Sequence, residues 1–128
     1  MSLQIEKQLT PKLGIAPAVI AATADGTGID CSKHEEVVYV LLIAAVVSLT
    51  SWDVKIQESE TVGGSYTDIS GAAFAQITTA DHEFHLGVRV NTAKPFQRVS
   101  HTLVGTSVAA SVALLLAKPG LIPAAAGA

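Results

Sequence analysis

Hydrophobic and polar residues alternate along much of this chain, which is typical of β-strands with one buried and one solvent-facing side. In residues 52–57 (WDVKIQ), one side consists of Trp52, Val54 and Ile56. Gly63-Gly64 follows between small polar residues, and a second alternating run begins at Tyr66. Glycines readily adopt the positive φ angles that tight reversals need. We therefore predict a β-hairpin over 52–74, with a turn at the two glycines and Trp52 in the core or at its rim.

Other segments show strand patterns before and after this hairpin. They are Ile15–Ala24, Ile29–Lys33, Glu36–Thr50, Ala72–Thr78, Glu83–Val90, Phe96–Val104 and Val108–Leu116. In Glu83–Val90 the inward residues are expected to be Phe84, Leu86, Val88 and Val90. Neither side of Phe96–Val104 is cleanly apolar, which predicts a strand near an edge or an interface, followed by a turn at 104–107. Seven or eight strands at roughly 10-residue spacing, without a helix, predict an all-β fold: an antiparallel β-sandwich or jelly-roll-like barrel.

The longest apolar run, Val37–Val47, is 11 residues long and rich in Val and Ile. A membrane-spanning helix needs about 20 apolar residues, so the run is interpreted as a buried strand rather than a membrane span. Continuous apolar character predicts that both of its faces are covered, either inside the sandwich or by a partner.

Both ends of the sequence differ in composition from the middle. Residues 1–14 are expected to form an N-terminal arm, 15–119 the β-sandwich and 120–128 a C-terminal tail. The tail, LIPAAAGA at 121–128, has no charge. Each terminus could either be disordered or lie against a neighbouring subunit. In the second case its anchors would include Leu3, Ile5, Leu9, Leu13, Leu121 and Ile122.

The composition narrows the classes of function. At 128 residues the chain is large enough for one domain with a two-layer core. Only 15% of residues are charged, against about 25% in ordinary soluble proteins, which suggests that partners cover part of the surface. A net charge of −3 without a basic stripe argues against nucleic-acid binding. The single cysteine, Cys31, is expected to fill space in the core, and the N-terminus lacks the pattern of a signal peptide, which favours a reducing cytoplasm as the site of synthesis.

No set of residues predicts catalysis, a metal or a cofactor. His82 and His85 would point to opposite faces of a strand, and the pair Cys31 and His34 lacks further ligands nearby. The carboxylates around the hairpin are interpreted as solvent-facing: Asp53, Glu58, Glu60 and Asp68. A small basic group could contact acidic surfaces of another protein: Arg89, Lys94 and Arg98.

The hairpin also carries a family resemblance. The segment from Lys55 to Phe74, KIQESETVGGSYTDISGAAF, resembles the hairpin of a group of small tailed-phage virion proteins. In that group an amphipathic strand ends in Gln-Glu-Ser, and a Gly/Ser turn and Thr-Asp-Val/Ile follow. Their later Lys/Arg-rich strand corresponds here to KPFQRV at 94–99, where Pro95 and Gln97 depart from the usual residues. The resemblance covers roughly residues 29–119.

The resemblance implies a structural role rather than an enzymatic one. We expect a decoration (cement) protein on the phage head, with the major capsid protein and further copies of itself, as dimers or trimers, as partners. A tail or head–tail joining component is the alternative within the virion. A carbohydrate-binding β-sandwich is the alternative from another class, although such modules usually display several exposed aromatic residues and this chain has six aromatics in all.

Overall fold

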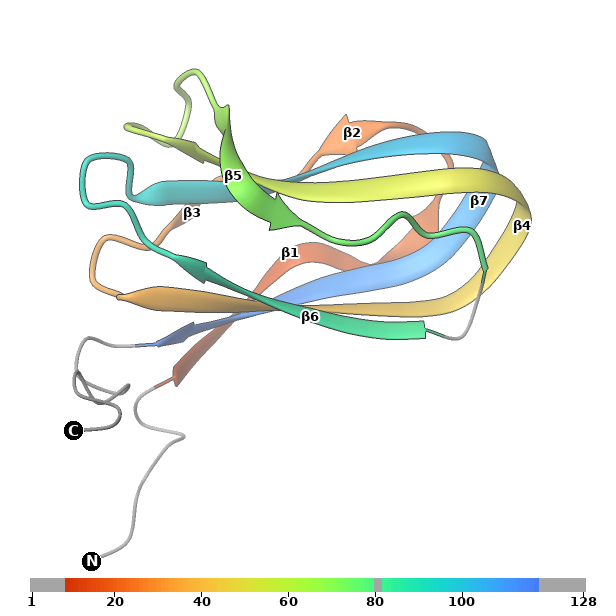
Figure 1. The fold of residues 1–128 in the computed structure, drawn as a ribbon, viewed down its shortest axis with the longest axis horizontal. Coiled ribbons are helices and arrows are strands. Elements are labelled where there is room, and N and C mark those ends of the chain that lie inside the picture. Colours follow the sequence, from red (N-terminus) through yellow and green to blue (C-terminus); the bar gives the residue numbers. More distant parts are fainter. Residues whose placement is uncertain (1–8, 80–81, 118–128) are drawn as a thin grey trace, which may run out of the picture.

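The computed structural model describes residues 9–79 and 82–117, and every regular element in them is a β-strand (Figure 1). None of the described residues belongs to a helix long and apolar enough to cross a membrane. The strands are β1 (Leu9–Ile20), β2 (Ala24–Asp25), β3 (Ile29–Asp30), β4 (Glu36–Ser59), β5 (Thr67–Ala73), β6 (His82–Arg89) and β7 (Phe96–Ala117). All pairings are antiparallel, so the predicted all-β antiparallel class is confirmed.

Two very long strands, β4 and β7, form the frame of the molecule. They pair along almost their whole length, from Glu36↔Ala117 at one end to Ser59↔Phe96 at the other. The ribbon that they form bends back on itself at the right of Figure 1. At the bend Ser48 and Gly105 have positive φ angles of 45° and 131°, and the register shifts between Leu49 and Ser51. These irregularities allow both strands to change direction at the bend, so that one half of the ribbon packs over the other.

The remaining strands extend the two halves of the ribbon into two layers. In the lower layer of Figure 1, β1 pairs with the second half of β7, and β6 pairs with the first half of β4. In the upper layer, β2 and β3 pair with the first half of β7, and β5 pairs with the second half of β4. The result is a sandwich in which β4 and β7 are central strands of both layers.

The core lies between the layers and consists of alternate residues of the long strands. The lower layer contributes Val37, Tyr39, Leu41, Val112, Leu114 and Leu116, all fully buried. The upper layer contributes Trp52, Val54, Ile56 and Val99, each at most 1% exposed. Burying side chains of this size stabilises the fold by about 1.5–3 kcal/mol each. Cys31 is buried and free, as the sequence predicted.

The predicted hairpin is confirmed, and its turn includes the two glycines, although neither has the positive φ that was expected. Lys55 pairs with Ala73 and Glu58 with Thr67, so the second half of β4 and β5 are the two strands. Neither Gly63 nor Gly64 has a positive φ; among the described residues, the glycines with positive φ are Gly71, at 78°, and Gly105. Within the loop, the amide of Gly64 donates to the carbonyl of Thr61 at 3.2 Å and closes a turn over residues 61–64. Trp52 lies in the core, as predicted.

The structure corrects part of the prediction for residues 96–107. Phe96–Val104 is near an edge, as predicted, but is not itself the edge strand: β4 pairs along one side of it, and the two-residue strands β2 and β3 pair with it on the other. The mixed pattern arises because two polar side chains, Gln97 and His101, are buried inward with partners of their own. The predicted turn at 104–107 is a bend within one continuous strand, and the predicted last strand, Val108–Leu116, is the second half of β7.

Smaller differences concern strand bounds. β1 begins at Leu9, so the last residues of the predicted N-terminal arm pair with β7 in the sheet. Residues 74–78 form only an isolated bridge, Trp52↔Ile77, instead of a strand of their own. In β6 the side chains of Phe84, Leu86 and Val88 face inward, as predicted, because Leu86 pairs with the buried Tyr39.

Candidate interaction surfaces

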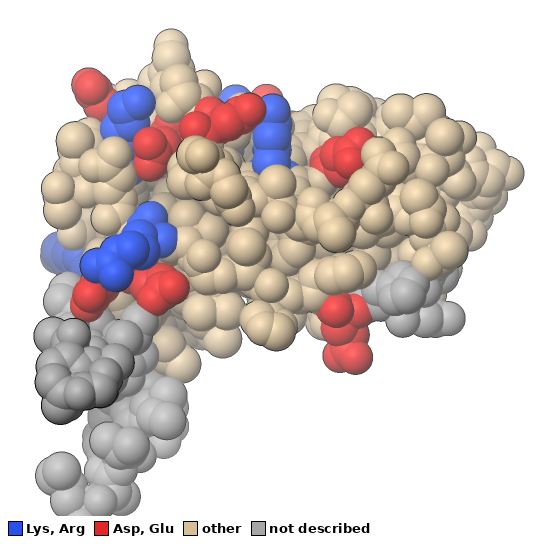
Figure 2. All heavy atoms as spheres, in the orientation of Figure 1, with Lys and Arg blue, Asp and Glu red and all other residues tan. Residues whose placement is uncertain are grey.

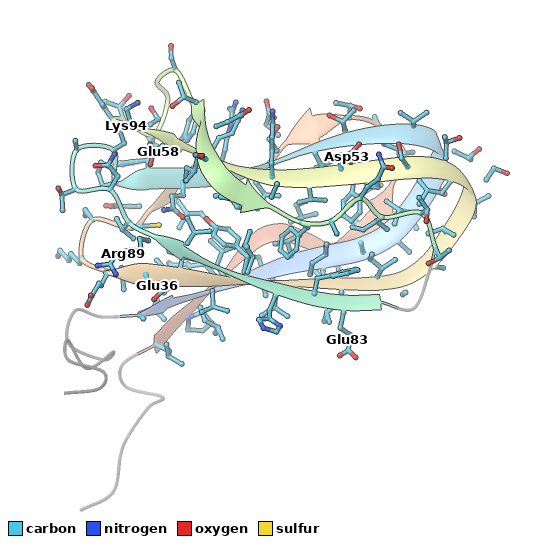
Figure 3. All side chains as sticks on the ribbon, in the orientation of Figure 1. Glu36, Asp53, Glu58, Glu83, Arg89 and Lys94 are labelled. Carbon is cyan, nitrogen blue, oxygen red and sulfur yellow. The ribbon has the colours of Figure 1, made fainter. Side chains whose placement is uncertain are left out.

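The outer faces of the two layers differ sharply in chemistry. Figure 2, which views the two layers from the side, shows Lys, Arg, Asp and Glu gathered along the upper layer and at the loop end of the molecule, and an acidic side chain below the lower layer. In Figure 3, Glu83 projects from β6 below the lower layer, while Arg89 and Glu36 lie together near its other end. We call the outward side of the lower layer the lower face, and that of the upper layer the upper face.

The lower face is mostly apolar. Alternation in β4 places Val38, Val40 and Leu42 outward, and β7 adds Ala113 and Leu115 beside them. β1 adds Leu13, which pairs with Ala113 and is 56% exposed. Leu42 is 44% exposed and Val19 69%. The run Val37–Val47 is therefore covered on one side by the core, whereas nothing in the described chain covers its other side.

The lower face has a large-residue half and a small-residue half. Leu13, Val38, Val40 and Leu115 lie towards the end where β4 begins. Towards the bend most outward residues are small, apart from the exposed side chains of Val19 and Leu42, and a hollow of about 540 Å³ opens among them. Its lining includes Ala18, Val19, Leu42, Ala44, Ala109 and Ser111. Charge lies only at the rim of this face among the described residues, at Glu36, Glu83 and Arg89.

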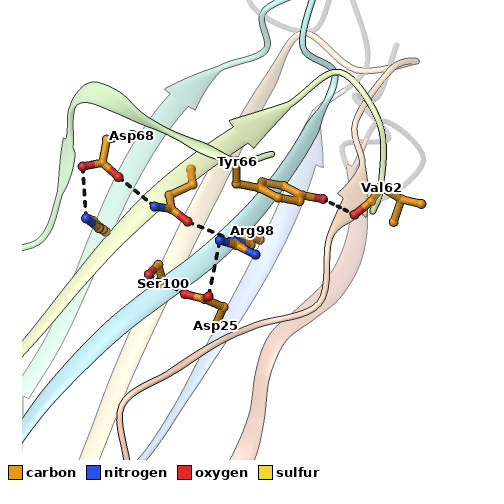
Figure 4. Close-up of polar contacts among 8 residues, drawn as sticks. Asp25, Val62, Tyr66, Asp68, Arg98 and Ser100 are labelled. Atoms are coloured by element: carbon orange, nitrogen blue, oxygen red, sulfur yellow. Dashed lines mark hydrogen bonds and ion pairs between the residues drawn. The ribbon is translucent and has the colours of Figure 1, made fainter. Parts of the chain in front are cut away.

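The upper face carries a connected polar network (Figure 4). Lys55 donates to Asp68 at 3.0 Å, Gln57 donates to the same carboxylate at 2.8 Å, and Arg98 donates to Gln57 at 2.9 Å. The guanidinium of Arg98 also pairs with Asp25 at 3.3 Å and lies 4.2 Å from the centre of the Tyr66 ring. The hydrogen bonds from Gln57 and Lys55 lower the pKa of Asp68. These side chains satisfy one another at the water-facing surface.

The predicted basic group is divided by the fold. Arg98 belongs to the polar network and is 24% exposed, so it acts mainly within the chain. Arg89 is 78% exposed and lies 3.6 Å from Glu35, and the ammonium of Lys94 lies 3.4 Å from the hydroxyl of Thr67. Both lie at the loop end of the sandwich, where Arg89 is exposed and Lys94 is half-buried (Figure 3).

The other predicted contact residues have different outcomes. Leu13 lies on the lower face, and Leu9 is partly buried at the start of β1. Leu3, Ile5, Leu121 and Ile122 lie outside the described residues. Four further residues of the lower face were not among the predicted contact residues: Val38, Val40, Leu42 and Leu115. The apolar run Val37–Val47 could have indicated them, because a strand with two apolar sides that packs on the core with one side leaves the other side for a partner.

The carboxylates around the hairpin take part in local polar contacts. Asp53 accepts hydrogen bonds from Gln76 at 3.2 and 3.3 Å, and Asp68 accepts from Lys55 and Gln57. Asp53 points outward from β4 in Figure 3. Within 9–79 and 82–117, no group of three or more His, Cys, Asp or Glu side chains could hold a metal ion.

A buried pair of rings lies beneath the upper face. The indole Nε1 of Trp52 donates to Nδ1 of His101 at 3.1 Å, and the rings meet edge to face with centroids 5.6 Å apart. Burial lowers the pKa of His101, although the negative charge of Asp25 opposes that shift. Neutral His101 is the acceptor that Trp52 needs, because a protonated imidazole has no free lone pair at Nδ1.

This pair predicts a loss of stability in mild acid. The pKa of His101 is lower in the folded state than its ordinary value near 6.5, so the unfolded chain binds more protons between these two values. Stability is therefore full above about pH 6.5 and falls as the pH drops towards the folded-state pKa. Urea unfolding followed by the fluorescence of Trp52, the single tryptophan, should show a lower midpoint at pH 5 than at pH 7.5.

The variant His101→Asn provides the comparison, because an amide oxygen can accept from Trp52 but does not titrate. His101→Asn should be less stable than wild type at pH 7.5. Its urea midpoint should change much less between pH 7.5 and pH 5 than that of wild type. The lowered pKa values of Asp30 and Asp68 act only in stronger acid, below about 3.8. An unchanged pH dependence in His101→Asn would assign the effect to another group.

The comparisons with known proteins show a shared fold. No model of a known protein family and no curated protein matches the sequence. The solved structure of the SPBc2 prophage-derived protein YomS aligns over 84% of this chain and 91% of its own, with a TM-score of 0.53 and 12% identity. Structures of infectious bursal disease virus also align: VP2 in a subviral particle (TM-score 0.57, 12% identity, 90% of this chain) and the Gx strain (0.56, 11%, 88%). This chain spans only about a third of those two viral chains, 34% and 33%. At these identities the chain shares its two-layer β fold with a prophage-derived protein and with a protein of a viral particle.

Proposed function

We propose that this chain is a structural virion protein of a tailed bacteriophage that decorates the outside of the head, binding across subunits of the major capsid protein. The lower face is the observation that carries the proposal. Soluble monomers rarely expose large contiguous apolar patches, and such patches usually mark interaction sites. Here the patch extends over three strands, β1, β7 and β4, with Leu13 and Leu42 about half exposed.

Two further observations support a virion role. The hairpin around Gly63-Gly64 resembles that of small tailed-phage virion proteins. The same fold occurs in a prophage-derived protein and in VP2 of a subviral particle. Neither observation distinguishes the head from the tail, so a tail or head–tail joining component is the alternative within the virion.

The proposed mechanism is mechanical. Each copy adds a compact sandwich to the shell surface, and repetition over a symmetric lattice turns modest individual contacts into high avidity. The exposed Arg89 and the half-buried Lys94 at the loop end give the chain, whose net charge is −3, a local site for acidic groups of the shell. The chain would be made in the host cytoplasm and act in the virion, and the proposal assigns it no catalytic role and no cofactor.

The competing role as a carbohydrate-binding module is less well supported. Stacking on a sugar ring needs exposed aromatic faces. All six aromatic residues of the chain belong to the described part, and each of them is buried or half-buried. Tyr66, at the surface of the upper layer, has the guanidinium of Arg98 over its ring.

The proposal predicts stoichiometric binding to shells. Purified protein should co-sediment with heads that lack it until the sites are saturated, and should raise the temperature at which those heads disrupt. Binding to tail tubes instead of heads would show that the protein is a tail component. If it binds neither, the virion role is wrong, and a glycan-binding screen becomes the next experiment.

The contribution of the loop end can be tested separately by charge reversal. Lys94→Glu and Arg89→Glu should each weaken binding to shells about tenfold, corresponding to about 1.4 kcal/mol. Lys12→Glu, at an exposed position on β1, serves as the matched control and should leave binding within about twofold. Equal effects of all three reversals would indicate a response to net charge rather than a local contact.

A further inference from the structure

We infer that the lower face binds the lower face of a second copy, so that the assembling unit is a two-fold symmetric dimer. This goes beyond the proposed function, since it holds whether the dimer is carried by a head or by a tail. In the dimer the second copy covers the lower face, and the loop end with Arg89 and Lys94 is left to contact the shell. Three properties of the lower face support a dimer: its shape, its area and the polar groups at its rim.

The shape of the lower face is complementary to itself. Large side chains, Leu13, Val38 and Leu115, lie in one half, and the hollow over Ala109 and Ser111 lies in the other. Consider a two-fold axis that lies in the plane of the interface and runs perpendicular to the strands. It places each strand opposite the same strand of the second copy, in the reverse direction. The large-residue half of each copy then meets the hollow of the other. Because an isologous interface repeats every contact, the complementarity operates twice.

The edge strand β6 supplies matching polar groups at the rim. Its outward residues include Glu83 and His85, which pair with Leu42 and Val40 of β4. The same axis, passing between the row of Val40 and the row of Leu42, brings Glu83 of one copy opposite His85 of the other. Each dimer would then have two such carboxylate–imidazole contacts flanking an apolar centre, the usual anatomy of a specific interface.

The area is sufficient for a stable pair. Four strands spaced about 4.8 Å apart, with about 30 Å of length, cover roughly 600 Å² on each copy. Two faces together would bury on the order of 1,100 Å², which exceeds the approximately 1,000 Å² expected of a biological interface. Two stacked sheets also pack face to face about 10 Å apart, the arrangement already present inside the sandwich.

The oligomeric state of the full chain tests the inference. Light scattering and sedimentation velocity over a concentration series should show a dimer of twice the chain mass of 13.2 kDa. Leu42→Lys should raise the dimer dissociation constant at least 100-fold, since it places an ammonium in the hollow. Val62→Lys is the matched control, because Val62 is 57% exposed in the β4–β5 loop, outside the lower face, and it should change dissociation by less than twofold. Circular dichroism and Trp52 fluorescence check that Leu42→Lys is folded.

A charge exchange tests the orientation. Glu83→His and His85→Glu should each weaken the dimer about tenfold, and the double variant should recover most of that loss. A monomer at all concentrations, a trimer, or a dimer indifferent to Leu42→Lys would overturn the inference. Shell binding is measured separately. A monomeric protein that saturates shells would leave the proposed function in place, whereas a dimer that ignores both heads and tails would contradict only the function.

Discussion

Gly105→Ala is expected to destabilise the protein by roughly 2–6 kcal/mol, a large part of the 5–15 kcal/mol that holds an ordinary domain folded. Gly105 has a φ of 131°, which costs other residues about 1–3 kcal/mol. A Cβ there would also lie 2.5 Å from the carbonyl oxygen of Ser48 and 2.9 Å from Cα of Leu49. Both are backbone atoms in the bend, so relief requires the bend itself to open, and crowding of this kind costs about a further 1–3 kcal/mol.

Two other glycines of the chain serve as matched controls for this substitution. Gly71 has a positive φ of 78° but open space around it, so Gly71→Ala should cost only the backbone strain, about 1–2 kcal/mol. Gly63 has neither a positive φ nor a neighbour within 4 Å, so Gly63→Ala should be within about 0.5 kcal/mol of wild type. Urea midpoints for the three variants should fall in this order. If Gly105→Ala were as stable as Gly63→Ala, the bend would not depend on Gly105.

Gln97→Leu is expected to cost about 1–3 kcal/mol, because it removes the partner of a buried hydroxyl. The hydroxyl of Tyr39 donates to Oε1 of Gln97 at 2.6 Å, and both residues are fully buried between the layers. The amide nitrogen of Gln97 also donates to the carbonyl of Arg89 at 3.3 Å, which ties the end of β6 to β7. Burial raises the pKa of Tyr39, so its hydroxyl stays protonated and able to donate.

A double-mutant cycle isolates this contact. Tyr39→Phe alone leaves Oε1 of Gln97 without its donor and should also cost about 1–3 kcal/mol, whereas Tyr39→Phe with Gln97→Leu removes both polar groups. The double variant should therefore lose less free energy of unfolding than the two single variants lose together. The difference, measured by urea unfolding, should be about 1 kcal/mol or more. Gln57→Ala, in the solvent-facing network, should cost less than about 1 kcal/mol. Additive single losses would mean that the hydrogen bond contributes little.

The two outer faces give these stability effects a functional context. The upper face is satisfied within the chain by the network through Gln57 and Arg98. The lower face presents Val38, Val40 and Leu42 without any such partners. Variants in the core or at the bend should therefore lower folding and assembly together, while Leu42→Lys should affect assembly alone. Measuring both properties for each variant separates the two kinds of residue.

Local pattern was sufficient to predict the hairpin and the inward side of β6. Alternation with period two fixes which residues share a face, so the burial of Trp52, Val54 and Phe84 followed directly from their positions. The same rule failed at Gln97 and His101. Whether a buried polar side chain is tolerated depends on a partner that comes from a distant strand: Tyr39 for one and Trp52 for the other.

The sequence by itself determined the class of this protein: an all-β chain with a hairpin at its centre and an apolar run too short for a membrane helix. Only the tertiary structure decided that two strands run through both layers, because the pairing of β4 with β7 joins residues up to 81 positions apart, as at Glu36↔Ala117. It also decided which side of Val37–Val47 faces the core and which is exposed. A periodic pattern records that both sides are apolar, but the register of neighbouring strands determines which one they cover.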